Sequence, residues 1–193
     1  VSGLGTALVG SAPAGIGSSA VAFDAASDTI YVANGNNANG GSPGGNTVSV
    51  IDTNRCNAQR TRGCRAPAQT VRVGNGPGGL AVDRQNQTIY VANTGDNTVS
   101  VIDARRCNAR HTAGCRQRPP VQSVGGAPGP IAVSKNGDTV YVANTGLGVT
   151  NNRVRGGNTV SVIDGTKCNG AHPRGCSAVR APVVAVGGFP GGQ

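Results

Sequence analysis

The sequence predicts an all-β protein made of repeated four-stranded antiparallel sheets. One long pattern occurs three times in the 193 residues, beginning at Gly15, Gly74 and Gly125. Each copy holds four short segments rich in Val, Ile, Thr and Tyr and bounded by Gly, Asn, Asp and Pro, which is typical of strands joined by tight turns. No segment with the period and length of a helix lies between them. Repeats of this size indicate an array of one supersecondary unit.

The first two segments of each copy are predicted to be neighbouring strands. The first is short and apolar, at residues 21–23, 80–82 and 131–133. The second carries the phrase Tyr-Val-Ala-Asn and is apolar at nearly every position, which is typical of a strand buried on both faces. We therefore expect its tyrosines to pack between neighbouring sheets rather than to contact a ligand. These are Tyr31, Tyr90 and Tyr141.

The third segment reads Thr-Val-Ser-Val-Ile-Asp in all three copies, and a fourth follows the second cysteine at residues 70–73, 121–124 and 183–186. We expect the aspartate that ends the third segment to cap the turn after it through its side-chain oxygen. These aspartates are Asp52, Asp103 and Asp164. A four-stranded antiparallel sheet covered on both faces is the unit of a β-propeller blade.

The shared pattern P-x-G-[IL]-A-V-x5-T-[IV]-Y-V-A-N…N-T-V-S-V-I-D resembles the YVTN β-propeller repeat family, in the variety with a C-N-x5-G-C hairpin in each repeat. The resemblance covers about residues 15–193, with Ser18-Ser19 in the first copy where the others have Pro-Gly. It implies a propeller of stacked four-stranded blades. It also implies a protein that is exported or at the cell surface, in a family whose functions are diverse and mostly unassigned.

The repeat makes residues 1–193 a single propeller region. It predicts the end of a preceding blade at 1–14 with a strand over 4–9, blades at 15–73, 74–124 and 125–186, and the start of a following blade at 187–193. Three blades do not close a ring, since propellers have about four to eight. We expect part of a larger propeller, because the third copy has its own fourth strand, or an arc that closes by association. An open arc exposes two apolar faces, which favours self-association.

The six cysteines fall as one C-x7-C pair in each copy, between the third and fourth strands. Equivalent partners eight residues apart in a hairpin should pair locally, as Cys56–Cys64, Cys107–Cys115 and Cys168–Cys176. Three disulfides imply an oxidising compartment and hence secretion or the cell surface. No apolar stretch reaches the roughly 20 residues that span a bilayer, and the signal peptide of an exported chain would already be removed or left out.

A metal site is the alternative for these cysteines. His111 and His172 stand midway in two of the pairs, and two thiolates with an imidazole are zinc ligands. However, Arg60 takes that position in the first copy, and no fourth ligand recurs. We therefore expect disulfides, with no metal and no other cofactor.

Positive charge is concentrated around the cysteine pairs. The formal net charge is +9, and twelve of the 17 cations lie in the three cysteine segments. On one rim these would form a basic stripe able to hold phosphates through Arg forks, although such charge also serves solubility alone. The candidate polyanion-binding residues are Arg60, Arg62, Arg65, Arg105, Arg106, Arg110, Arg116, Arg118 and Arg174.

Blade topology places the cysteine hairpins on the face of the turns between first and second strands, and the connections between second and third strands on the opposite face. The latter vary most in length between the copies, and insertions of this kind often mark the binding face. They also serve as spacers, or their Asn and Asp oxygens as calcium ligands. The candidate ligand-loop residues are Asn34, Asn46, Asn144, Asn158, Arg153 and Arg155.

No catalytic constellation is visible in the sequence. The chain has no Glu, both His lie in the cysteine hairpins, and no nucleophile stands beside a base. The predicted function is a secreted or cell-surface, non-enzymatic binding or scaffold protein that uses its face loops, with a protein, cell-surface or polyanionic partner. The alternatives are a polyanion binder (nucleic acid or anionic cell-wall polymer) acting through the basic rim, and part of a propeller enzyme, a lyase or oxidoreductase, whose site lies in other blades.

Overall fold

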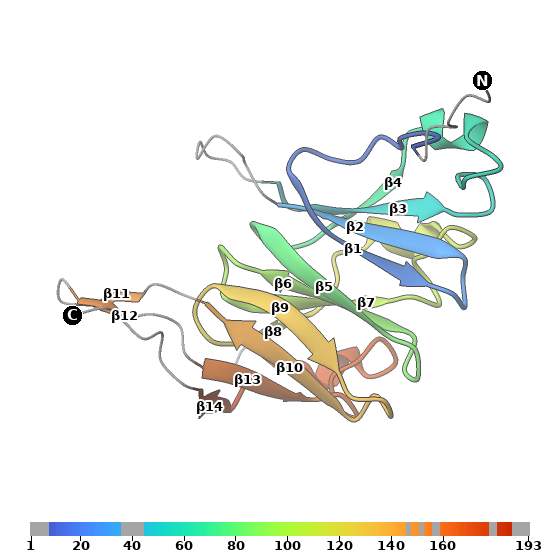
Figure 1. Ribbon diagram of the computed structural model, residues 1–193. Coiled ribbons are helices and arrows are strands. Elements are labelled where there is room, and N and C mark those ends of the chain that lie inside the picture. Colours follow the sequence, from blue (N-terminus) through green and yellow to red (C-terminus); the bar gives the residue numbers. More distant parts are fainter. Residues whose placement is uncertain are drawn as a thin grey trace, which may run out of the picture.

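Three four-stranded antiparallel sheets make up the protein in the computed structural model (Figure 1). The structure describes residues 8–35, 45–145, 148–150, 153–155, 159–177 and 181–186. In all three sheets the strands lie side by side in the order in which they occur along the described chain. We call each sheet a blade. The predicted all-β class and all four strand segments of every copy are confirmed.

The strands of each blade recur at equivalent positions of the repeat. The first blade consists of β1 (Ser18–Asp24), β2 (Thr29–Asn34), β3 (Thr47–Asp52) and β4 (Gln69–Arg72). The second consists of β5 (Pro77–Asp83), β6 (Thr88–Asn93), β7 (Thr98–Asp103) and β8 (Val121–Ser123). The third consists of β9 (Pro128–Val133), β10 (Thr139–Asn144), β13 (Thr159–Asp164) and β14 (Val183–Ala185). A short 3-10 turn precedes each fourth strand, namely η1 (Arg62–Arg65), η2 (Ala113–Arg116) and η3 (Pro173–Gly175).

The central strands pair in one register in all three blades. Tyr31 pairs with Val50, Tyr90 with Val101 and Tyr141 with Val162. Because side chains alternate between the faces of a strand, this shared register puts every tyrosine on the same face of its blade. The sequence repeat is therefore a repeat of three-dimensional structure.

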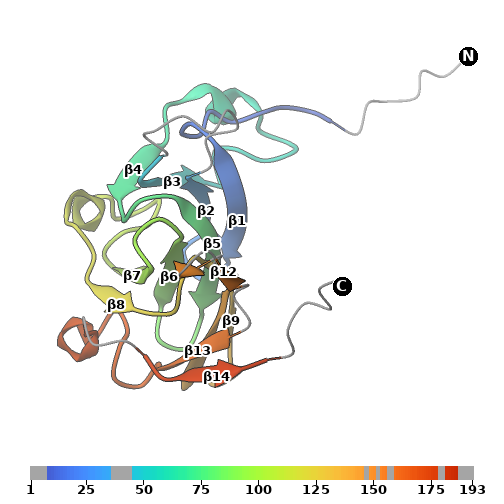
Figure 2. The same ribbon diagram turned by 90° about the vertical axis from the view of Figure 1, so that its left-hand side faces the viewer.

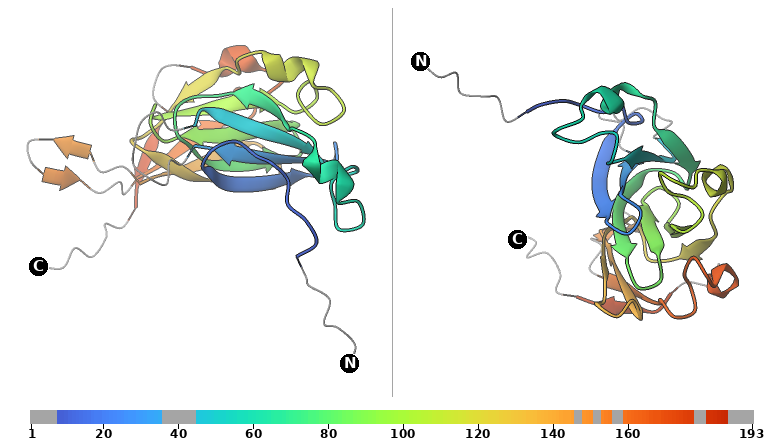
Figure 3. Two further views of the ribbon diagram at one scale, coloured as in Figure 1. Left: turned by 90° about the horizontal axis from the view of Figure 1, so that it is seen from above. Right: turned by 90° about the vertical axis from the view of Figure 1, so that its right-hand side faces the viewer.

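The blades stand side by side in an open arc, with β1, β5 and β9 in contact along its inner edge (Figures 2 and 3). The approach of β5 to β9 is close enough to require glycine. A Cβ on Gly79 would lie 2.3 Å from the carbonyl oxygen of Gly129. The backbones of neighbouring blades therefore touch where this position lacks a side chain.

Two apolar cores hold the arc together, one at each junction between blades. The first joins Tyr31, Val48, Val50, Val71 and Val73 of the first blade to Ile89, Val91 and Ile102 of the second. The second joins Tyr90, Val99, Val101 and Val124 of the second blade to Val140, Val142 and Ile163 of the third. At both junctions the tyrosine face of one blade thus packs against the isoleucine face of the next.

The middle blade shows the predicted burial on both faces, and the outer blades show it on one. All six residues of β6 are buried. In β2, by contrast, Ile30 and Val32 are only half-buried, and in β10 the side chain of Tyr141 is 45% exposed. Burial of the tyrosine was predicted for all three copies, and it is wrong for Tyr141 because no described blade covers that face.

Two further segments differ from what the sequence predicted. The long connection after β10 contains an additional hairpin of β11 (Gly148–Thr150) and β12 (Arg153–Arg155), which the sequence did not predict. The strand expected over 4–9 lies mostly outside the described residues, and its last two, Leu8 and Val9, are exposed and not in a strand. No helix in the described part of the chain is long and apolar enough to cross a membrane.

We predict that Gly79→Ala lowers the free energy of unfolding by about 1–3 kcal/mol, because the new methyl group forces β5 and β9 apart. Gly126→Ala is the matched control, since a Cβ there meets nothing within 4 Å. Urea denaturation followed by circular dichroism measures both variants. Equal stability of the two would contradict the close approach of the inner strands.

Candidate functional site

The three cysteine hairpins lie on one side of the arc and are each closed by a disulfide. The bonds are Cys56–Cys64, Cys107–Cys115 and Cys168–Cys176, with Cα atoms 4.5, 4.6 and 4.6 Å apart. The predicted local pairing is confirmed. Sulfurs joined in this way are not thiolate ligands, and His111 and His172 are exposed. Within the described residues no three His, Cys, Asp or Glu side chains converge as a metal site would require.

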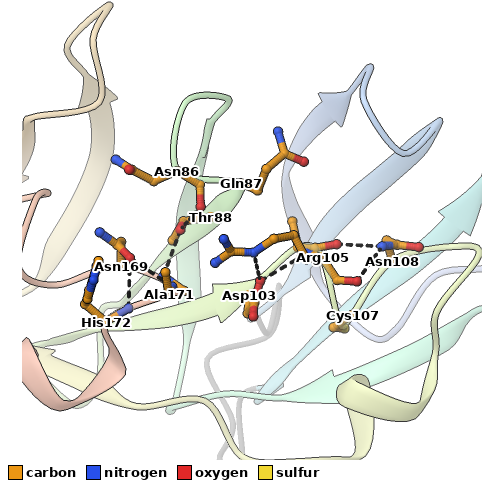
Figure 4. A network of polar contacts seen from close by, with 12 residues as sticks. Asn86, Gln87, Thr88, Asp103, Arg105, Cys107, Asn108, Asn169, Ala171 and His172 are labelled. Atoms are coloured by element: carbon orange, nitrogen blue, oxygen red, sulfur yellow. Dashed lines mark hydrogen bonds and ion pairs between the residues drawn. The ribbon is translucent and has the colours of Figure 1, made fainter.

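An asparagine follows the first cysteine of every hairpin and shapes the turn. In the second hairpin the Asn108 amide donates to the carbonyl oxygen of Ala104 at 2.6 Å, while its side-chain oxygen accepts from the backbone N–H groups of Arg110 and His111, both at 2.8 Å. Figure 4 shows the third hairpin, where the side-chain oxygen of Asn169 accepts from the N–H groups of Ala171 and His172. Asn57 and Asn169 make the same set of bonds in their hairpins. The asparagine of C-N-x5-G-C is therefore a structural residue.

A glycine precedes the second cysteine of every hairpin because no side chain fits there. A Cβ on Gly63, Gly114 or Gly175 would lie 1.8, 2.3 or 1.8 Å from the carbonyl oxygen of the residue just before the first cysteine, which is Arg55, Arg106 or Lys167 respectively. Such contacts are far shorter than atoms tolerate. The disulfide, the asparagine and the glycine together give all three hairpins the same shape.

The second and third hairpins are each fastened to the preceding blade by polar bonds as well as by apolar packing. The Tyr31 hydroxyl donates to the carbonyl oxygen of Cys107, and the Tyr90 hydroxyl to that of Cys168, both at 2.7 Å. The threonine two residues before each tyrosine accepts from the next hairpin: Thr29 from the N–H of Ala109 at 3.0 Å, and Thr88 from that of Gly170 at 2.8 Å. The sequence did not reveal these bonds, because their partners stand 76 to 82 residues apart.

Burial shifts the ionisation of the two fastened tyrosines. Removal from water raises the pKa of Tyr31 and of Tyr90 well above the usual range, and the nearby carboxylates of Asp24 and Asp83 respectively add to the rise. Both side chains are fully buried. The neutral phenol is therefore the form that the fold requires.

The hairpin face is basic and open to solvent. All nine candidate arginines of this face are exposed. Two of them form ion pairs, Arg105 with Asp103 at 2.9 Å and Arg110 with Asp28. Among the described residues the other seven have no carboxylate within ion-pair distance, namely Arg60, Arg62, Arg65, Arg106, Arg116, Arg118 and Arg174.

Carboxylates of the same face are mostly engaged in turns. The side-chain oxygen of Asp52 accepts from the N–H of Asn54, that of Asp103 from Arg105 and that of Asp164 from Thr166, which confirms the predicted turn caps. The hydrogen bond from the Thr166 hydroxyl lowers the pKa of Asp164, and the hydrogen bond from the Lys167 side chain lowers it further. Asp24 and Asp83 are buried and bonded within their own turns. These anions are occupied locally, which leaves most of the arginines available.

A pocket on this face is lined by residues of two hairpin regions. Its lining includes Arg106 and Arg118 from the second hairpin region and Gly170 and Pro173 from the third. Asp103 also borders it. Two guanidinium groups that form no ion pair within the described part of the chain therefore border a recess between blades, where an anionic group can meet both.

The opposite face holds the candidate ligand loops. Asn34 and Asn144 are buried, and their amides donate to Ser49 and Ser161 of the neighbouring strand at 2.9 and 3.0 Å. These two asparagines therefore brace the blade and do not point into the loops. Asn93 of the copy with the short loop makes the same bond, to Ser100. Asn46 is half-buried next to β3. Asn158 lies outside the described residues, and Arg153 and Arg155 lie on β12.

Comparison with known proteins places the fold without assigning a function. No protein-family model and no curated protein matches the chain. Among solved structures it is similar to Kuenenia stuttgartiensis hydrazine synthase, with a TM-score of 0.59 and 20% identity over 96% of this chain and 40% of that one. It is also similar to apo AztD from Citrobacter koseri, with a TM-score of 0.51 and 12% identity over 89% of this chain and 35% of that one. The chain spans two fifths or less of these proteins, and at such identity the likeness concerns the fold alone.

We predict that Tyr31→Phe and Tyr90→Phe each lower the free energy of unfolding by about 1–2 kcal/mol, because each leaves a buried carbonyl oxygen without its donor. Urea denaturation measures the effect. Val121→Ala, at a side chain 41% exposed on β8, is the control and should change stability little. Wild-type stability in both tyrosine variants would show that the hydroxyl bonds do not fasten the hairpins.

We also predict that stability falls as the pH rises above about 10, the ordinary pKa of tyrosine. The unfolded chain then loses the phenol protons while the folded chain, with its raised pKa values, retains them, so alkaline pH favours unfolding. Unfolding at a series of pH values tests this. The Tyr31→Phe/Tyr90→Phe double variant should show a shallower alkaline decline, and an unchanged decline would refute the assignment.

Proposed function

We propose that the protein is an exported, non-enzymatic binding protein of the YVTN-like propeller type, and that its hairpin face binds an anionic polymer. The observation that carries this proposal is the set of seven exposed arginines on one face without a described carboxylate partner. The disulfide-closed hairpins fix the course of the backbone from which these side chains project. Such preorganisation lowers the entropy lost on binding.

The chemistry of this face favours phosphate or sulfate groups over bases as the recognised feature. Guanidinium groups match such oxyanions through paired N–H donors. Stacking on nucleic-acid bases requires aromatic side chains, and the described aromatic residues, Phe23 and the three tyrosines, lie on strands β1, β2, β6 and β10 rather than in the hairpins. An extracellular polymer with anionic groups along its backbone therefore fits better than a single-stranded nucleic acid.

Export is supported by the three disulfides, which are stable in oxidising compartments. Two of them are also part of the junctions between blades, since Cys107, Cys115 and Cys168 are buried in the two cores. A reducing environment would therefore loosen the hairpins and the blade junctions together. This dependence on intact disulfides favours a location outside the cytosol.

We predict that labelled polyphosphate and heparin bind the protein with an affinity that falls steeply with salt, because binding releases counterions from the polymer. Fluorescence anisotropy at several salt concentrations measures this. Arg106→Ala should weaken binding and make the salt slope shallower by about one. Arg72→Ala removes the same charge from an exposed position on the first blade, at the end opposite the hairpins, and is the matched control.

Two results would reject the proposal. One is an affinity that does not change with salt. The other is equal weakening by Arg106→Ala and Arg72→Ala, which would mean that net charge alone attracts the polymer. A single-stranded oligonucleotide is included in the same assay, and tighter binding to it than to both other polymers would contradict the preference for backbone anions.

A further inference from the structure

The first and the last blade each present an apolar face that the described part of the chain leaves uncovered. On the first blade, Val21 is 67% and Phe23 47% exposed, next to the half-buried Ile30, Val32 and Ile51. We call these five residues the first end face. On the last blade, Tyr141 is 45%, Val184 55% and Val186 46% exposed, next to the half-buried Val160 and Val162. We call these five the last end face.

Each end face repeats one half of a junction that the chain builds twice internally. The residues equivalent to Ile30, Val32 and Ile51 in the second blade are Ile89, Val91 and Ile102, which are at most 3% exposed. The residues equivalent to Tyr141, Val160 and Val162 there are Tyr90, Val99 and Val101, at most 1% exposed. The two end faces therefore correspond to the two complementary halves of one junction.

The polar bonds of the internal junctions also have their counterparts at the two ends. In the register of the repeat, Tyr141 corresponds to Tyr31 and Tyr90, whose hydroxyls donate to the carbonyl oxygen of the first cysteine in the next hairpin. The first blade carries such a hairpin, and its Cys56 carbonyl accepts no bond from the described residues. Likewise Thr139 corresponds to Thr29 and Thr88, and Ala58 to the Ala109 and Gly170 that donate to them.

We propose that a second copy of this chain covers both faces, with the last end face of each copy packed on the first end face of the other. The Tyr141 hydroxyl of one copy then donates to the Cys56 carbonyl of its partner. Two three-blade arcs make six blades, within the usual four to eight. The two contacts are heterologous, and they close into a ring when the rotation permits. This inference does not depend on the proposed polymer binding.

The oligomeric state tests the proposal directly. Sedimentation equilibrium and size exclusion with light scattering should give about twice the chain mass of 19.0 kDa. A monomer throughout the micromolar range would overturn the proposal. Species that keep growing with concentration would overturn it as well, since they indicate head-to-tail contacts that do not close.

Matched variants then locate the contact. Tyr141→Asp and Phe23→Asp each place a charge on one end face and should raise the dissociation constant of the dimer about tenfold or more. Val121→Asp is the control, because that exposed side chain lies on the outer strand of the middle blade, on neither end face. Circular dichroism confirms that each variant remains folded. Dissociation of all three variants to the same extent, or of none, would refute the assignment.

Mixing the two disruptive variants distinguishes complementary faces from like faces. The Tyr141→Asp protein keeps an intact first end face, and the Phe23→Asp protein keeps an intact last end face. An equimolar mixture should therefore regain dimers through one intact contact, at concentrations where each variant alone is monomeric. No gain on mixing would mean that the dimer does not form through the last end face on the first.

Discussion

The packing of one blade's tyrosine face against the next blade and its hairpin is the interaction on which the rest of this structure depends. A four-stranded sheet with few large side chains buries little apolar surface alone, and each blade here obtains its core only at a junction. The tyrosine is the largest residue in that core, and its hydroxyl finds a backbone carbonyl in the neighbouring hairpin. Apolar packing and a satisfied polar group thus occur at one position.

This junction explains why the cysteine hairpin is so constant. Its disulfide, its asparagine and its glycine hold a carbonyl oxygen and an N–H group where the tyrosine and threonine of the preceding blade need them. Within this frame, the exposed arginines of the hairpins lie outside the two apolar cores. Seven of the nine make no ion pair with a described carboxylate, and this is the feature that most favours a binding role for this face.

The two ends of the arc follow from the same principle. A repeat that buries its faces only against neighbours leaves one face open at each end, and these faces carry the residues that are buried elsewhere in the molecule. The half-buried Ile30 and the exposed Tyr141 differ from Ile89 and Tyr90 only in what lies opposite. Neighbouring structure, not local sequence, decides their exposure.

The sequence by itself determined the strands, their order within each blade, the pairing of the cysteines and the turn caps at Asp52, Asp103 and Asp164. These features depend on residues close together in the chain, and the threefold repeat removes the ambiguity of each. Only the tertiary structure decided that Tyr31 reaches Cys107, that Asn34 braces its own blade, and that a further hairpin follows β10. The first of these pairs residues 76 positions apart. Identical Tyr-Val-Ala-Asn phrases also give one exposed and two buried tyrosines, because burial is a property of the neighbour across the junction, which no local pattern encodes.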